Sequence, residues 1–144
     1  MNDVKPYYGS DERIRELARG FENCSLPDED FDHRAHLMVA IWYLSSMPAE
    51  EAAARMRRGL LSYLAHYGAD PVKYNETITQ YWVRRLDKLL SETDGSLPLY
   101  ERARQAVERA GESSLIFEYY SRERLFSEEA REGWLKPDLK PMES

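Results

Sequence analysis

The chain has 144 residues, of which 42% are hydrophobic and 32% charged, and its formal net charge is −6. This length suits one hydrophobic core, so we expect a single domain over residues 1–144, with extended termini at 1–9 and 136–144. Acidic and basic residues are interspersed, which excludes the large basic surface that nucleic acids require. The longest apolar run, LMVAIWYL, is too short to span a membrane, and the single Cys24 excludes an intrachain disulfide, so we expect a cytoplasmic protein.

Seven helical segments follow one another along the chain. Each combines apolar residues at helical spacing with a start or stop signal. The clearest signals are the N-cap Ser10, the early Pro48 of the third segment, and the closing glycines Gly68 and Gly111. The expected segments, in chain order, are about 11–22, 30–47, 48–67, 75–92, 97–110, 113–121 and 127–134.

The tail LKPDLKPMES carries two prolines and is expected to be an extended strap, with Trp134 and Leu139 packed over the helices. No run of alternating apolar and polar residues rich in β-branched side chains predicts a strand. The expected fold is therefore all-α: a compact, single-domain bundle of five to seven helices with an extended C-terminal strap.

Two of the three histidines begin the most apolar segment, FDHRAHLMVAIWYL. An α-helix turns about 100° per residue, so His33 and His36 lie on the same stripe as Leu37, Ala40 and Ile41. The two imidazoles therefore extend the apolar face into one end of the core. A buried imidazole needs a hydrogen bond, a metal or a ligand, so this stripe predicts a polar site inside the bundle.

The third histidine is expected at the same end of the bundle. His66 lies in the last turn of the third helix, and Asn75 and Glu76 begin the fourth. The second and third helices are joined by a very short connection, which favours an antiparallel pair. The start of the second helix and the end of the third would then meet, and the sequence predicts one pocket formed by His33, His36, His66, Asn75 and Glu76.

Two kinds of chemistry suit this set, and the sequence leaves both open. His33, His36, His66 and Glu76 are residue types that bind a divalent transition metal such as Zn, Fe, Mn, Ni or Cu. Without a metal, Glu76 would act as acid or base, with His36 and His66 as proton-transfer partners. The predicted substrate-binding residues are Tyr43, Asn75, Trp82 and Arg34.

Over about residues 30–141 the chain resembles a family of small, largely uncharacterised bacterial all-helical proteins. The matching pieces are FDHRAHLMVAIWYL, HYG followed by KYNETITQYW, and YYSRERLFSEEAREGWLKPDLKP. His36, His66 and Glu76 match polar positions of that family, and His33 matches more loosely. The family usually has Y-H-E-T-I-T or Y-H-E-T-L-T where this chain has Asn75, and asparagine is a poor ligand for a transition metal. The resemblance implies a fold and a site but no reaction.

The favoured function is an enzyme that acts on a small polar or anionic metabolite through this His/Glu pocket, with or without a metal. The alternative is a non-enzymatic interaction or regulatory protein whose histidines only join helix ends. A homodimer that buries the alanine-rich face of EEAAARM is compatible with either function.

Overall fold

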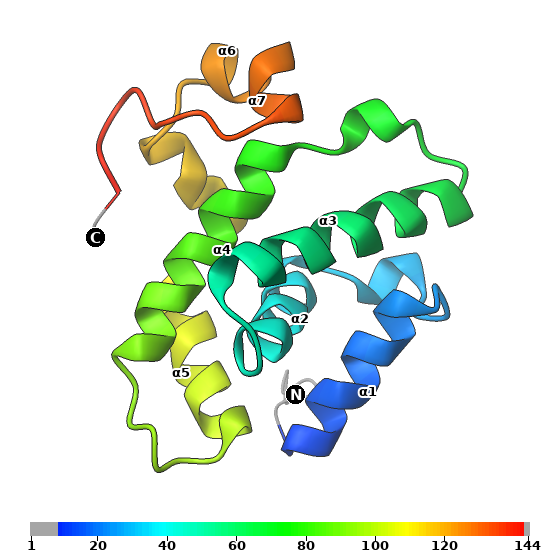
Figure 1. The fold of residues 1–144 in the computed structure, drawn as a ribbon, viewed down its shortest axis with the longest axis vertical. Coiled ribbons are helices and arrows are strands. Elements are labelled where there is room, and N and C mark those ends of the chain that lie inside the picture. Colours follow the sequence, from blue (N-terminus) through cyan, green and yellow to red (C-terminus); the bar gives the residue numbers. More distant parts are fainter. Residues whose placement is uncertain (1–8, 143–144) are drawn as a thin grey trace.

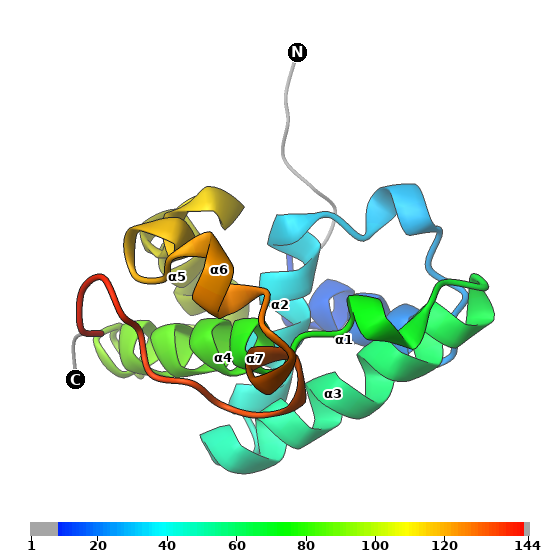
Figure 2. The same cartoon turned by 90° about the horizontal axis from the view of Figure 1, so that it is seen from above.

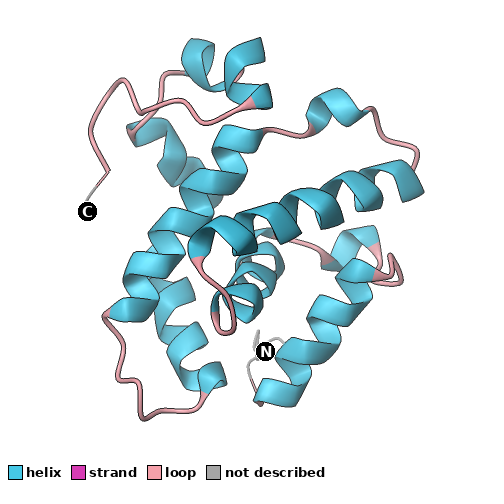
Figure 3. Cartoon of the chain, viewed as in Figure 1, coloured by secondary structure: helices cyan, strands magenta, loops and turns pink. Residues whose placement is uncertain are grey.

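The computed structural model describes residues 9–142 and confirms the all-α fold (Figures 1 and 3). Over these residues the chain forms seven α-helices and three 3-10 helices, and no strand. The α-helices are α1 (Asp11–Glu22), α2 (His33–Leu44), α3 (Ala49–His66), α4 (Glu76–Ser91), α5 (Leu99–Ala110), α6 (Arg122–Leu125) and α7 (Glu128–Glu132). The 3-10 helices are η2 (Asp28–Asp30), η3 (Pro71–Lys73) and η4 (Ser113–Glu118). In the described part of the chain, no helix is both long and apolar enough to cross a membrane.

The helix starts follow the capping signals of the sequence. The side chains of Ser10, Asp32, Asn75 and Ser127 each accept a hydrogen bond from a backbone N–H in the first turn of the helix that follows. The short helix α6 was not predicted, and two predicted segments differ clearly from the structure. The second helix ends at Leu44 rather than near residue 47, and residues 113–118 form a 3-10 helix rather than an α-helix.

Helix α2 is the centre of the core, where it packs against α1, α3, α4 and α5 (Figures 1 and 2). The sequence predicted one apolar stripe on this helix. Instead, α2 is buried on nearly all sides, because side chains outside the stripe, such as Met38, Val39 and Tyr43, are also covered. A helix that is apolar all round is typical of the interior of a bundle.

Helix α3 crosses α2 rather than running antiparallel along it (Figures 1 and 2). It has 18 residues, so it is about 27 Å long at 1.5 Å per residue. Both views show that its C-terminal end lies away from α2. This crossing determines which of the predicted site residues can meet.

The segment after α7 is a strap without regular helix, held mainly by hydrogen bonds. The Tyr120 hydroxyl donates to the carbonyl of Leu135 at 2.6 Å, and the Leu139 N–H donates to the carbonyl of Tyr119 at 2.9 Å. Trp134 packs against Tyr120 edge to face. The Leu139 side chain is 57% exposed, so its predicted packing over the bundle is wrong. The remaining terminal residues, 1–8 and 143–144, lie outside the described part.

Candidate functional site

An open cavity of about 400 Å³ lies between α2, α4 and η4, and we call it the histidine cavity. Its polar lining consists of two imidazoles, His33 and His36, and two hydroxyls, Ser113 and Ser114. None of these lining residues carries a permanent charge. The apolar part of the lining consists of Leu37, Ile78, Trp82, Ile116, Phe117 and Leu125.

His33 joins the start of α2 to the end of α5. Its Nε2 donates a hydrogen bond to the carbonyl oxygen of Gly111 at 3.1 Å, and its ring meets Trp82 edge to face, with centroids 4.8 Å apart. Gly111 has φ +92°, a conformation that glycine adopts without strain. This bond requires the proton on Nε2, so His33 forms a fixed wall of the cavity.

His36 lies one turn further along α2 and has a different environment. Its ring stacks on Phe31 with centroids 5.3 Å apart, and within residues 9–142 neither of its ring nitrogens has a hydrogen-bond partner. Burial, together with the nearby His33, lowers the pKa of His36 to about 4. The imidazole is therefore neutral at neutral pH, and its nitrogens are available for one donated and one accepted hydrogen bond.

Asn75 lies near His36, but in a different cavity from His33. Asn75, His36 and Ile78 all line a second, smaller cavity of about 230 Å³. The amide of Asn75 is already occupied: it donates to the carbonyl of Leu125 at 2.8 Å and accepts from the N–H of Ile78 at 3.0 Å. Asn75 is 7% exposed, so the structure gives it a role in holding α4 rather than a free polar group.

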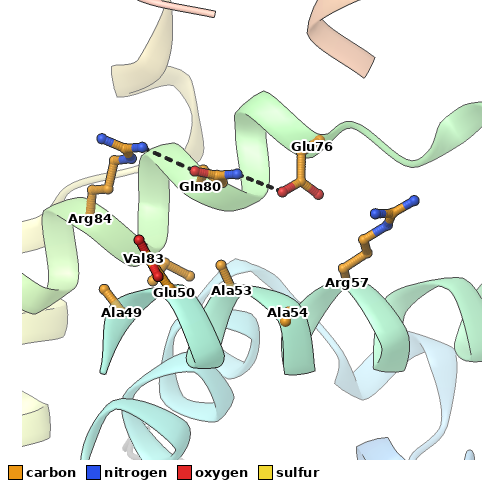
Figure 4. A pocket seen from close by; sticks show the side chains of 9 residues that line it. All are labelled: Ala49, Glu50, Ala53, Ala54, Arg57, Glu76, Gln80, Val83 and Arg84. Carbon is orange, nitrogen blue, oxygen red and sulfur yellow. Dashed lines mark hydrogen bonds between the residues drawn. The ribbon is translucent and has the colours of Figure 1, made fainter. Parts of the chain in front are cut away.

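Glu76 faces away from the histidine cavity, into a groove of about 550 Å³ between α3 and α4 (Figure 4). Its carboxylate accepts hydrogen bonds from the Tyr74 hydroxyl at 2.6 Å and from Gln80 Nε2 at 2.7 Å. Burial and this bond to Glu76 raise the pKa of Tyr74 above its usual range. Glu76 and His36 therefore line different cavities, although sequence reasoning placed them in one pocket.

Three other predicted residues also lie apart from the two imidazoles. His66 is exposed at the end of α3, where its ring contacts that of Tyr67, and Arg34 is exposed on α2. Tyr43 is near the opposite end of α2, where its hydroxyl donates to Glu22 at 2.6 Å. Of the four predicted substrate-binding residues, Trp82 alone lines the histidine cavity.

The predicted metal centre of His33, His36, His66 and Glu76 is not assembled. Within residues 9–142, no group of three or more His, Cys, Asp and Glu side chains is placed to hold a metal ion. The reason is geometric. Helix α3 crosses α2 and leaves His66 at an exposed end, while Glu76 points into the α3–α4 groove.

Sequence reasoning missed the part of the cavity that η4 contributes. Ser113, Ser114 and Phe117 follow the helix stop at Gly111, and the sequence assigned this segment to a helix without a function. The one available signal was the pair of serines directly after the stop. Nothing in the sequence indicated that this segment would return to the start of α2.

Comparison of the chain with protein-family models, with curated proteins and with solved structures gave no match in any of the three. The resemblance to a small bacterial family therefore stays a prediction from the motifs. Function has to be inferred from the geometry of the histidine cavity.

Proposed function

We propose that this protein binds a small, largely apolar molecule in the histidine cavity, with His36 making the polar contact. The observation that carries the proposal is the partly buried imidazole of His36, which lines the cavity without a hydrogen-bond partner in the described chain. An imidazole nitrogen that lies in a mostly apolar wall without a protein partner can still donate or accept one hydrogen bond. A ligand with one hydrogen-bonding group would satisfy it.

The lining favours an uncharged ligand with an aromatic ring. No Lys or Arg lines the cavity, and His36 is neutral at neutral pH, so no lining side chain compensates the charge of an anion. Trp82 and Phe117 offer ring surfaces, and Ser114 lies at the exposed rim. The proposed ligand is thus less polar than the metabolite expected from the sequence. A cytoplasmic location, inferred from the single Cys24, is part of the proposal.

Binding is favoured here over acid–base catalysis. A base with a pKa of about 4 accepts a proton weakly at neutral pH, and the carboxylate of Glu76 lines a different cavity. Catalysis by Glu76 with His36 and His66 therefore stays a prediction from the sequence. The geometry supports a binding protein in its place.

Thermal unfolding with matched ligands tests this proposal. Phenol and toluene have similar shapes, but only phenol can form a hydrogen bond with His36. We expect phenol to raise the Tm more than toluene, because a ligand that binds the folded state stabilises it. In the variant His36→Leu the cavity keeps an apolar wall, so the difference between the two ligands should disappear.

A blocking variant provides the control for location. Ser114→Trp fills the exposed rim of the cavity, whereas Glu112→Trp places the same side chain two residues earlier, outside the lining. We expect Ser114→Trp to abolish the increase in Tm caused by phenol and Glu112→Trp to keep it. An equal shift in both variants, or no preference for phenol in the unmodified protein, would contradict the proposal.

A further inference from the structure

The groove between α3 and α4, where Glu76 lies, carries an ordered pattern of charges (Figure 4). On the α3 side, Glu50 lies at one end and Arg57 at the other, with alanines between them. On the α4 side, the order is reversed: Arg84 lies at the Glu50 end and Glu76 at the Arg57 end. Each end of the groove thus has one acid and one base.

On the α3 side, an acidic and a basic residue lie at equal distances from the middle of the pattern. Glu50, Ala53, Ala54 and Arg57 are spaced i, i+3, i+4 and i+7, so they share one face of the helix, and all four line the groove. Reversal about the midpoint between the two alanines exchanges Glu50 with Arg57. Consider a two-fold axis that lies between two copies, perpendicular to α3 and level with this midpoint. It places Glu50 of one copy opposite Arg57 of the other, and this pair occurs twice.

The α4 side has the same property, independently. Glu76, Gln80 and Arg84 are each four residues apart on one face of α4, and all three line the groove. Reversal about Gln80 exchanges Glu76 with Arg84. The α3 and α4 charges occupy the same two ends of the groove (Figure 4), so one two-fold axis that runs across both helices also brings Glu76 of one copy opposite Arg84 of the other.

These groups are placed to meet a partner. Glu50, Arg57 and Arg84 are exposed, and within residues 9–142 Glu50 and Arg57 form no salt bridge or hydrogen bond with each other or with any other residue. Arg84 is held in place by two contacts. Its Nη2 donates a hydrogen bond to Gln80 Oε1 at 3.1 Å, and its guanidinium carbon lies 4.0 Å from the centroid of the Trp134 ring. The alanines between the charges allow a second helix to approach closely.

We propose that this groove docks a second copy of the chain, with the two α3 helices antiparallel across a two-fold axis. Glu50 then pairs with Arg57 of the second copy, and Glu76 pairs with Arg84. The arrangement is isologous and closes as a dimer, because each surface is complementary to itself. The dimer lies on a different face from the histidine cavity and does not depend on what that cavity binds.

Charge reversal followed by sedimentation equilibrium tests this dimer. We expect the unmodified protein to sediment as a dimer. Glu50→Arg places two cations opposite each other, and Arg57→Glu places two anions, so each single variant should weaken dimerisation by about tenfold or more. The double variant Glu50→Arg/Arg57→Glu exchanges the charges and should restore the dimer.

Arg58→Glu is the matched control, because Arg58 is adjacent in sequence but does not line the groove. This variant should remain dimeric. The charged positions are exposed, and circular dichroism confirms that each variant is folded before it is compared. An unmodified protein that sediments as a monomer, or a double variant no more dimeric than the single ones, would overturn the proposal.

Discussion

A neutral imidazole in the wall of a cavity is costly to protonate, and this property distinguishes His36 from the other two histidines. His33 donates to Gly111, and His66 is exposed at a helix end. For His36, burial and the neighbouring His33 lower the pKa to about 4. Its charge state therefore links the stability of the protein to pH.

The folded protein should lose stability as the pH falls through the range that separates the two pKa values of His36. The pKa is about 6.5 in the unfolded chain and about 4 in the folded protein, so between these values the unfolded state binds more protons. The contribution of neutral His36 to the free energy of unfolding is complete above pH 6.5 and is lost as the pH falls through about 4. Its upper limit is about 3 kcal/mol. Urea unfolding across this range measures it.

Carboxylates also titrate in this range, so the measurement requires a reference variant. In His36→Gln the part of the slope due to the imidazole should be absent, whereas His33→Gln should retain the larger part of it, which is due to burial. Identical slopes in the unmodified protein and His36→Gln would show that the imidazole is not buried as described.

Asn75 and Glu76 show how far residue-level prediction can reach. Both were expected to enter one pocket with His36, but the structure makes Asn75 the N-cap of α4. Asn75 has an extended backbone as the N-cap and Glu76 is the first helical residue, and their side chains diverge, toward Leu125 and toward the α3–α4 groove. The sequence gives the adjacency of the two residues but not the element that each side chain faces.

Asn75→Ala should destabilise the protein by about 2–4 kcal/mol, because it removes an N-cap and a buried hydrogen bond to Leu125 together. Asn75→Asp separates the two effects. It keeps the cap oxygen for Ile78 and loses the donor to Leu125. Chemical denaturation should rank its stability between those of the unmodified protein and the alanine variant; an alanine variant as stable as the unmodified protein would contradict this account.

The packing of α1 against α3 depends on a glycine inside a helix. Gly59 lies in α3, and a Cβ atom at this position would approach the ring of Phe21 to 2.6 Å at Cζ. Phe21 is fully buried and stacks on Phe31, so its ring has no free space to move into. The missing side chain allows α1 to pack closely on α3.

Gly59→Ala should therefore destabilise the protein by about 1–3 kcal/mol, although alanine is the better helix former. Gly20→Ala is the matched control in α1. Its Cβ would contact Leu26 at an ordinary 3.4 Å, so the substitution should stabilise the protein by up to about 1 kcal/mol. Thermal unfolding of the two variants should show Tm shifts of opposite sign, and two upward shifts would contradict the proposed close packing.

The sequence predicted helix ends better than helix packing. Caps, prolines and glycines act within a few residues, which is why α1 was predicted with its observed bounds. Crossing of helices depends on side chains far apart in the chain. The short connection before α3 favoured an antiparallel pair, but the buried sides of α2 accommodate four other helices. Because α3 crosses α2 instead of running along it, His66 lies apart from His36, and the local signals did not predict this.

The histidine cavity joins segments that are far apart in sequence. His36 comes from α2 and Trp82 from α4, while Ser114 and Phe117 follow α5. The all-α class could be predicted because local periodicity determines it. The cavity could be predicted only in part, because the return of η4 to the start of α2 depends on the complete core.

The most direct test of binding in the histidine cavity is an NMR titration with phenol, observed through the ring C–H signals of the three histidines. We predict saturable shifts for His36 and smaller ones for His33, while the exposed His66 is unaffected. The Ser114→Trp variant should show none of these shifts. Equal, unsaturated changes at all three histidines, or a His36 signal that does not respond to phenol, would contradict the proposed binding function.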